Sequence, residues 1–197
     1  MLRVRLADDE GFGLVELLIA MTILVIGITA IVAGFSSGIV ALQRSSQVST
    51  ASVVADQQME SYRRVRFSAI ALDTTLFAGV DSTYTTDTAY PPSPPGTLTG
   101  ACAGSSTASG YYYCNPSRTT TGPDGRSYRI DSYVRWACVL PAPGTVLDAT
   151  VTPPTCTPTL AGVAKSRAVR SVTVVVRGGN PSRVLVRETS MFDESTG

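Results

Sequence analysis

The sequence contains no histidine among its 197 residues, and only 16% of its residues are charged. Without histidine, the chain lacks the commonest general base, the usual hydrolytic triads and most zinc chemistry. The 16 basic and 15 acidic residues nearly cancel, so the chain has no basic excess of the kind that neutralises nucleic-acid phosphates. The scarcity of charge and the positive mean hydropathy indicate a membrane segment, and the composition as a whole, above all the absence of histidine, argues against an enzyme.

Charge is missing altogether from Leu17 to Leu42, and Glu16 is the only charged residue between Phe12 and Gln43. This run of about 26 residues would measure roughly 39 Å as a helix, against a bilayer core of about 30 Å. It is too long for the apolar core of a cleaved secretory signal, and acidic residues directly precede it. A plain signal anchor would leave the intramembrane carboxylate of Glu16 without a purpose. A third interpretation accounts for that carboxylate.

The start of the uncharged run carries the string GFGLVELLIA at residues 11–20. This string resembles the class III signal of type IV prepilins and type II secretion pseudopilins, and the resemblance is confined to about residues 11–45. It implies that a prepilin peptidase cuts between Gly11 and Phe12 on the cytoplasmic side of the membrane. It also implies that the same enzyme N-methylates Phe12, which becomes the first residue of the mature chain.

Glu16 is the predicted assembly residue of this signal. Cleavage would create a positive α-amine on Phe12 at the base of a hydrophobic helix. In a filament core an unpaired charge is costly and a paired one is tolerable. Glu16 is therefore predicted to neutralise the amine of a neighbouring subunit and to set the axial register. The alternative is that its side chain simply extends to the membrane interface.

The sequence departs from the family pattern at three places. Gly13 stands where threonine is commonest, and the leader carries acidic residues close to the cut. The helix-breaking proline that major pilins carry in the mature helix is absent. The missing proline favours a minor pilin or a pseudopilin over the bulk subunit of a filament.

The helical pattern continues beyond the membrane segment. Apolar residues recur at three- and four-residue steps from Arg44 to Leu72, and no proline interrupts the chain from Phe12 to Phe77. These observations predict one helix from Phe12 to about Leu72. Its first part would lie in the membrane or filament core, and its second part would pack on a globular domain.

The second half of the chain has the pattern of a β-sheet domain. Residues 73–126 are rich in Thr, Ser, Gly and Pro, which predicts an irregular connection and not a core. Ser127 to Leu140 alternates, with Arg129, Asp131 and Arg135 on the polar face, and this is typical of a half-buried strand. Residues 168–177 and 183–189 are predicted to form two more strands.

Together these segments predict an α+β fold, in which a long N-terminal pilin-type helix packs on a small antiparallel sheet. The predicted organisation is a cleaved leader (1–11), a transmembrane or filament-core helix (12–43), an amphipathic continuation of that helix (44–72), a Ser/Thr/Pro/Gly-rich connection (73–126) and a β-sheet head (127–197).

The four cysteines, Cys102, Cys114, Cys138 and Cys156, all lie in the second half of the chain. Their wide spacing and the absence of histidine disfavour a metal site, and export to an oxidising compartment favours disulfides. Nearest-neighbour pairing would join Cys102 to Cys114 and Cys138 to Cys156. The two other pairings remain open, because spacing alone does not fix connectivity.

These features predict a structural subunit, a minor pilin of a type IV pilus-like filament, with no catalytic activity, metal or cofactor. The expected partners are other pilin subunits, the prepilin peptidase and the inner-membrane assembly platform, while nucleic acid is not expected. Before assembly the chain would be a single-pass cytoplasmic membrane protein with its N-terminus inside and its C-terminal domain outside. It would then enter a cell-surface or periplasmic filament.

Two alternative functions share the same processing signal. The chain could be a type II secretion pseudopilin, or a tip subunit that acts as an adhesin or in DNA uptake. An anchored exported enzyme is a weaker hypothesis, because the only lysine, Lys165, and the serines stand in no nucleophile motif.

Overall fold

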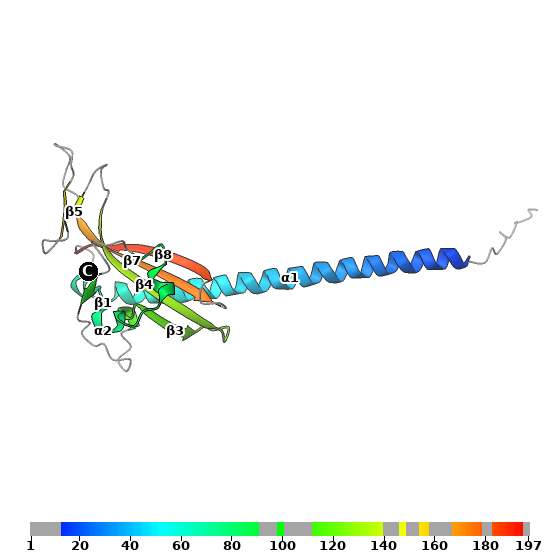
Figure 1. The fold of residues 1–197 in the computed structure, drawn as a ribbon, viewed down its shortest axis with the longest axis horizontal. Coiled ribbons are helices and arrows are strands. Elements are labelled where there is room, and N and C mark those ends of the chain that lie inside the picture. The colour runs from blue at the N-terminus through cyan, green and yellow to red at the C-terminus, as the bar shows by residue number, and fades with distance from the viewer. Residues whose placement is uncertain are drawn as a thin grey trace, which may run out of the picture. The chain divides into compact units, whose positions relative to one another are not determined.

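A computed structural model of the chain describes residues 13–90, 98–100, 112–139, 146–148, 154–157, 167–178 and 183–194. The chain divides into two compact units, Met1–Ser45 and Ser46–Gly197. One long helix, α1 (Leu14–Arg63), contributes to both units, and the second unit also holds the strands (Figure 1). The protein is therefore α+β, with an apolar N-terminal helix followed by an antiparallel sheet, as the sequence predicts.

Helix α1 ends earlier than its periodicity predicts, at Arg63 instead of about Leu72. Arg66 already has an extended backbone, with ψ of 146°, and a single turn of 3₁₀ helix, η1 (Phe67–Ala69), follows it. The apolar residues beyond Arg63 therefore belong to a bent segment and do not form a helical stripe.

Tertiary contacts explain this bend. The guanidinium of Arg170 donates hydrogen bonds to the carbonyl oxygens of Phe67 (2.5 Å) and Ile70 (2.8 Å). The same guanidinium lies over the rings of Phe67 and Trp136, 4.7 and 4.9 Å from their centroids. Because Arg170 holds these carbonyls and the Phe67 ring, the chain turns against the sheet where local pattern alone would continue the helix.

The main sheet has four antiparallel strands in the order β3-β4-β7-β8. Their bounds are β3 (Ser117–Thr121), β4 (Ser127–Cys138), β7 (Ala168–Gly178) and β8 (Val184–Phe192). The strands β4, β7 and β8 confirm the three predicted strands, whereas β3 lies inside the segment predicted to be irregular. The turn from β3 to β4 uses Gly125 at φ of +73°, a left-handed conformation that glycine adopts without strain.

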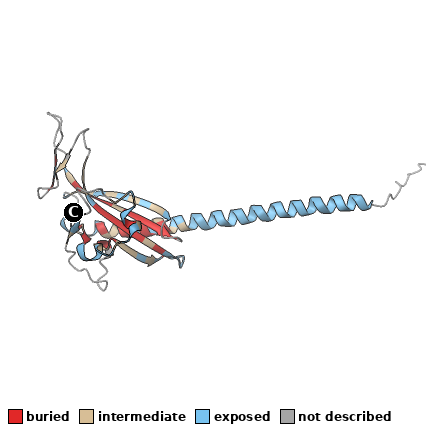
Figure 2. Cartoon of the chain, viewed as in Figure 1, coloured by how far each residue is buried: buried red, intermediate tan, exposed pale blue. Residues whose placement is uncertain are grey.

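One face of the sheet packs on the last turns of α1 and forms the main core (Figure 2). The helix contributes two alanines near the start of this contact and larger side chains, Met59 and Tyr62, near its end. Buried residues on this face include Ala51, Ala55, Met59 and Tyr62 of α1, Tyr128, Ile130 and Val134 of β4, and Val172, Val174 and Val176 of β7.

The opposite face of the sheet is covered as well, which corrects two predictions. Residues 74–90, which we name the strap, contain the short helices α2 (Thr74–Phe77) and α3 (Ser82–Thr85). Tyr84 of the strap is fully buried and packs with Tyr133 of β4 and Val175 of β7. Part of the predicted connection is therefore core. The polar face of β4 is not simply solvated, because Asp131 on that face is fully buried.

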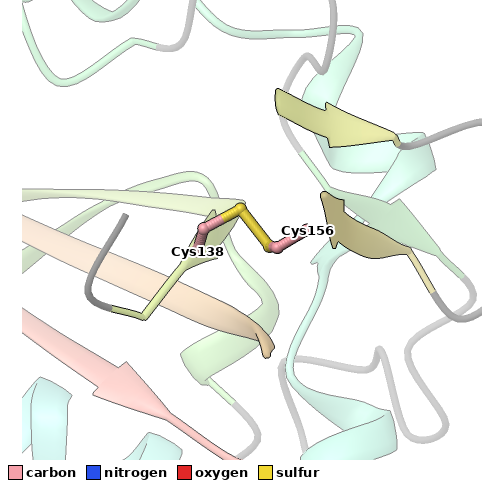
Figure 3. Close-up of a disulfide and its surroundings, with 2 residues drawn as sticks. All are labelled: Cys138 and Cys156. Atoms are coloured by element: carbon pink, nitrogen blue, oxygen red, sulfur yellow. A yellow bond between two sulfur atoms is a disulfide. The ribbon is translucent and has the colours of Figure 1, made fainter. Parts of the chain in front are cut away.

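A second turn of 3₁₀ helix, η3 (Tyr112–Cys114), and two small ladders complete the described elements. β1 (Leu72–Asp73) pairs in parallel with β2 (Thr99–Gly100), and β5 (Val146–Asp148) pairs antiparallel with β6 (Thr155–Thr157). A disulfide between Cys138 at the end of β4 and Cys156 in β6 ties this second ladder to the main sheet (Figure 3).

Candidate functional site

The first turn of α1 is the candidate assembly site. The amide of Leu17 donates to the carbonyl oxygen of Gly13 (3.2 Å), so Gly13 is the residue before the first turn and Glu16 lies within that turn. A carboxylate there is favourable, because it faces the partial positive charge of the free amides. Glu16 thus has a local stabilising role even in the isolated subunit, besides any role toward a second chain.

The predicted cleavage site lies outside the described residues. Gly11 and Phe12 precede the first described position, Gly13. The predicted cut between them, the methylation of Phe12 and the charge pair of its amine with Glu16 therefore stay predictions. In the structure Glu16 is exposed and lies in the first turn of α1, which begins at Leu14 and is continuous.

The N-terminal part of α1 exposes an apolar surface on all sides (Figure 2). Leu14 is 76% exposed, and large apolar side chains as far as Leu42 remain about half or more exposed. By length and composition α1 could cross a membrane. Contiguous apolar surface of this extent is unfavourable in water, so this part of α1 is suited to an apolar environment such as lipid.

Three hydroxyl groups inside this apolar stretch, those of Thr22, Thr29 and Ser36, are satisfied within the helix. Thr22 donates to the carbonyl oxygen of Ile19 (2.8 Å), and Ser36 donates to that of Val32 (2.9 Å). Thr29 likewise lies 2.9 Å from backbone carbonyl oxygens one turn earlier. Because a donor in hydrocarbon must find its partner inside the protein, these bonds make the helix compatible with a lipid environment.

The second unit contains an arginine–aspartate network between the sheet and the strap. Its members are Asp81 and Asp87 of the strap, Arg129 and Asp131 of β4, Arg177 of β7 and Arg187 of β8. Asp131 is at its centre, 2.8 Å from the Arg129 guanidinium and 2.9 Å from that of Arg177. Arg177 also pairs with Asp87, which accepts a second bond from Arg187 at 2.8 Å.

The electrostatics of this network are those of a structural cluster. Three carboxylates face three guanidinium groups, so the charges balance and the buried ones are paired. The hydrogen bonds from Arg129 hold the pKa of Asp81 at about 2, well below its usual value. A carboxylate held ionised in this way is a poor proton donor or acceptor near neutral pH.

The buried tyrosines on the two faces of the sheet are also unsuited to proton transfer. Burial raises the pKa of Tyr84 far above its ordinary value and that of Tyr62 to about 12. Within the described part of the chain, no group of three or more carboxylate or cysteine side chains is arranged to hold a metal ion.

The cysteines give one defined bridge. Cys138 and Cys156 are joined, as nearest-neighbour pairing predicts. Cys114 is buried and disulfide-bonded. Cys102 lies outside the described residues, so the predicted Cys102–Cys114 pairing stays a prediction.

Sequence reasoning missed the network and the strap. Asp131 and Arg129 are two residues apart, but the other pairs of the network join residues that are 46 or more positions apart in the sequence. Two aspartates, Asp73 and Asp81, were the local signals of helical turns in the strap. Each accepts a hydrogen bond from a backbone amide two or three residues later in the chain. Such caps mark the start of helical turns inside a segment whose composition suggested none.

A comparison with known protein families gives a match in the N-terminal region of the chain. The family described as the prokaryotic N-terminal methylation motif matches residues 7–32, a range that contains Gly11, Phe12 and Glu16. Neither a curated protein nor a solved structure matches the chain significantly.

Proposed function

Because the chain is a type IV prepilin-like, membrane-anchored protein, we propose that it is a minor pilin, a structural subunit of a type IV pilus-like filament. The observation that carries the proposal is the methylation motif at residues 7–32, which includes the start of a continuous apolar helix whose only early charge is Glu16. The motif belongs to proteins that assemble with other pilin subunits after peptidase processing. The proposed role as a structural subunit is therefore inferred from what proteins with this motif generally do.

The proposed processing has two steps. The peptidase would cut between Gly11 and Phe12 and methylate the new amine of Phe12. The chain would insert with its N-terminus in the cytoplasm and its second unit outside, where the Cys138–Cys156 disulfide can form and persist. The inner-membrane assembly platform and neighbouring subunits would then receive the processed helix.

The proposed assembly is driven by the surface that α1 exposes. Helix packing would bury the apolar side chains between Leu14 and Leu42, and Glu16 would neutralise a neighbouring Phe12 amine. This role requires no catalysis by the chain itself. The buried, paired carboxylates and the tyrosines of raised pKa support a structural second unit.

A pseudopilin of a type II secretion system is the second candidate. The unbroken course of α1 from Leu14 to Arg63 fits a pseudopilin as well as it fits a minor pilin, since only a bulk pilin is expected to carry a helix-breaking proline in this helix. The two candidates can be distinguished by whether the chain is found in surface filaments and by whether its loss stops protein export. A minor pilin is expected in sheared surface filaments, whereas loss of a pseudopilin would stop export of secreted proteins without removing those filaments.

The test is the intact mass of the full-length chain extracted from membranes, with and without the prepilin peptidase. We expect a chain that begins at Phe12 and carries one added methyl group only when the peptidase is present. Glu16→Ala should be processed normally but absent from filaments, because the Phe12 amine then lacks its partner. Asp8→Ala, in the leader, is the matched control and should assemble. A chain that still begins at Met1 would contradict the proposal.

A further inference from the structure

The outer edge of β8 is a long open strand edge. β8 is the last strand of the main sheet and lies at its border (Figure 1). Its nine residues include neither proline nor lysine, the two residue types that most often protect such edges. Among the described residues no backbone hydrogen bond reaches β8 from its outer side. Alternate amide and carbonyl groups along β8 are therefore available to another strand.

β8 is regular along most of this edge. Its register with β7 shifts between Val184 and Val186, and from Val186 to Phe192 each residue pairs with one residue of β7. The two charged side chains of β8, Arg187 and Glu188, are adjacent and so point to opposite faces of the sheet. Because side chains stand roughly perpendicular to a sheet, neither of them covers the backbone edge.

An apolar pocket opens at the end of this edge. It has a volume of about 330 Å³ and lies between residues 190–193, at the end of β8, and the end of α1 with the turn that follows it. Its apolar lining residues are Val65, Phe67, Ile70, Met191 and Phe192. A pocket of this size and lining can hold one large apolar side chain.

Four residues before Phe192, on the same face of β8, the surroundings are acidic. Glu188 lies beside Asp56 of α1, and burial together with the Asp56 carboxylate raises the pKa of Glu188, although Arg63 opposes this shift. Arg63 itself pairs with Glu60 (3.3 Å). Two neighbouring carboxyl groups therefore remain that a positive charge would stabilise. We name the open edge, the pocket and this carboxyl pair the β8 groove.

We infer that the β8 groove binds an extended segment of another polypeptide, which adds a strand to the sheet, places an apolar side chain in the pocket and a lysine or arginine opposite Glu188. Side chains four positions apart lie on the same face of a strand, so three residues separate the two anchors. Backbone hydrogen bonds supply affinity and the anchors supply selectivity. The site lies within the second unit, so the inference goes beyond the proposed function and does not depend on it.

The border strands of a second copy of this chain do not match the groove. The only basic residue of β8, Arg187, lies on the face opposite to that of Glu188, so a second β8 strand would present no cation to the carboxyl pair. β3 carries Arg118 but no large apolar residue for the pocket. A segment from a different polypeptide is therefore the better match.

Binding of a designed peptide tests the inference. The probe is a fluorescent heptapeptide of alternating threonine, with phenylalanine second, valine fourth and lysine sixth, an order suited to an antiparallel strand. It is titrated into the full-length chain in phosphatidylcholine nanodiscs, with empty nanodiscs as the control for adsorption. We expect saturable binding, about fivefold or more weaker when glutamate replaces the lysine and about tenfold or more weaker when alanine replaces the phenylalanine. No saturable binding, or equal binding of the glutamate peptide, would overturn the inference.

Backbone methylation separates strand addition from adsorption of side chains. One version of the peptide is N-methylated at its threonines and the other at the three residues between them, and both keep every side chain. Successive amides of a strand point to opposite edges, so only the version whose methylated amides face β8 should lose binding. Equal effects of the two versions would exclude pairing with β8.

A charge reversal in the chain provides the last measurement. Glu188→Lys should invert the preference, so that the glutamate peptide binds more tightly than the lysine peptide, whereas Val184→Thr, at the far and exposed end of β8, should bind as the wild type. An unchanged preference in Glu188→Lys would contradict the inference. So would a change in the oligomeric state of Glu188→Lys without any peptide binding, because a second copy would then occupy the groove. None of these outcomes bears on processing at Gly11 and Phe12, which tests the proposed function separately.

Discussion

Asp131 shows how a charged side chain can occupy the interior of this protein. It is fully buried on a β-strand, and it accepts hydrogen bonds from Ser117 (2.7 Å), Arg129 (2.8 Å) and Arg177 (2.9 Å). Its carboxylate therefore loses water but keeps three donors. Removing one member of a buried ion pair usually costs more than the pair contributes, because the remaining charge stays buried.

Asp131→Asn is predicted to lower the free energy of unfolding by about 3–5 kcal/mol, because Arg177 then keeps only part of its compensation. Unfolding of the full-length chain in detergent can be followed by fluorescence of the single tryptophan, Trp136, which lies in the same strand. Glu60→Gln breaks only exposed pairs with Arg63 and Arg64, and should change stability by less than about 0.5 kcal/mol. Similar effects of both substitutions would contradict the structural role of the network.

Asp81 gives a pH dependence whose sign can be stated. Its pKa is about 2 in the folded chain and 3.8 in the reference state, chiefly because Arg129 donates hydrogen bonds to it. A depressed folded pKa stabilises the fold above the unfolded value, and this contribution is lost as the pH falls through the folded value. The Asp81–Arg129 contribution is thus expected at pH 5 and should disappear between about pH 4 and pH 2.

The measurement is the denaturant midpoint of unfolding from pH 5 to pH 2 for the wild type and Asp81→Asn. Because other carboxyl groups titrate in both proteins, the informative quantity is the difference between the two curves. We expect that difference to be largest at pH 5 and to shrink below pH 4. A difference that stays constant over this range would exclude the proposed linkage.

Single elements of this fold serve more than one environment. α1 exposes apolar residues before Leu42 and buries small ones such as Ala51 and Ala55 against the sheet. The strap covers the opposite face of the sheet, where the Tyr84 hydroxyl donates to the Ser132 carbonyl oxygen (2.6 Å) and its ring stacks on Tyr133 with centroids 4.4 Å apart. The sheet is thus enclosed between two elements of different kinds.

Tyr84→Ala is predicted to destabilise the second unit by about 3–5 kcal/mol, because it removes a fully buried aromatic ring and leaves a cavity under the strap. Tyr84→Phe keeps the ring and should cost about 1–3 kcal/mol for the unsatisfied Ser132 carbonyl. Thr85→Ala, at the next and exposed position, should stay within about 0.5 kcal/mol. Equal stability of all three variants in thermal unfolding would show that the strap is not part of the core.

At the scale of the whole molecule, the two units have opposite solvent requirements. The large apolar residues exposed before Leu42 belong to the first unit, whereas the second unit has buried cores on both faces of its sheet. We therefore expect the full chain to need detergent or lipid. A chain restricted to residues 46–197 should be soluble and folded, because it retains the turns of α1 that complete the core.

The check compares the two chains in buffer after detergent removal. The full chain is expected to sediment, and the shortened chain to remain in solution with the same Trp136 emission and the same unfolding midpoint. Precipitation of the shortened chain would show that the first unit is needed for folding and not only for anchoring.

Local sequence was sufficient for the features that depend on local pattern. An uncharged run long enough to span a bilayer predicted the anchor, and a glycine–phenylalanine–carboxylate spacing predicted the processing signal. Alternation over residues 127–140 predicted β4, while the valine-rich run 168–177 and the segment 183–189 predicted β7 and β8. Each of these depends on neighbours only a few positions away. The signal itself was accessible without any knowledge of the second unit.

Tertiary structure alone decided the end of α1, the second covered face of the sheet and the pairing of Asp131. Each arises from partners far apart in the chain: Arg170 with Phe67, Tyr84 with Tyr133, and Arg177 with Asp131. The composition of residues 73–90 predicted an irregular connection, because threonine and serine outnumber the few tyrosines. Those tyrosines nevertheless pack this segment against the sheet. A buried charge likewise has the same local pattern as an exposed one, and only the position of its distant partner distinguishes them.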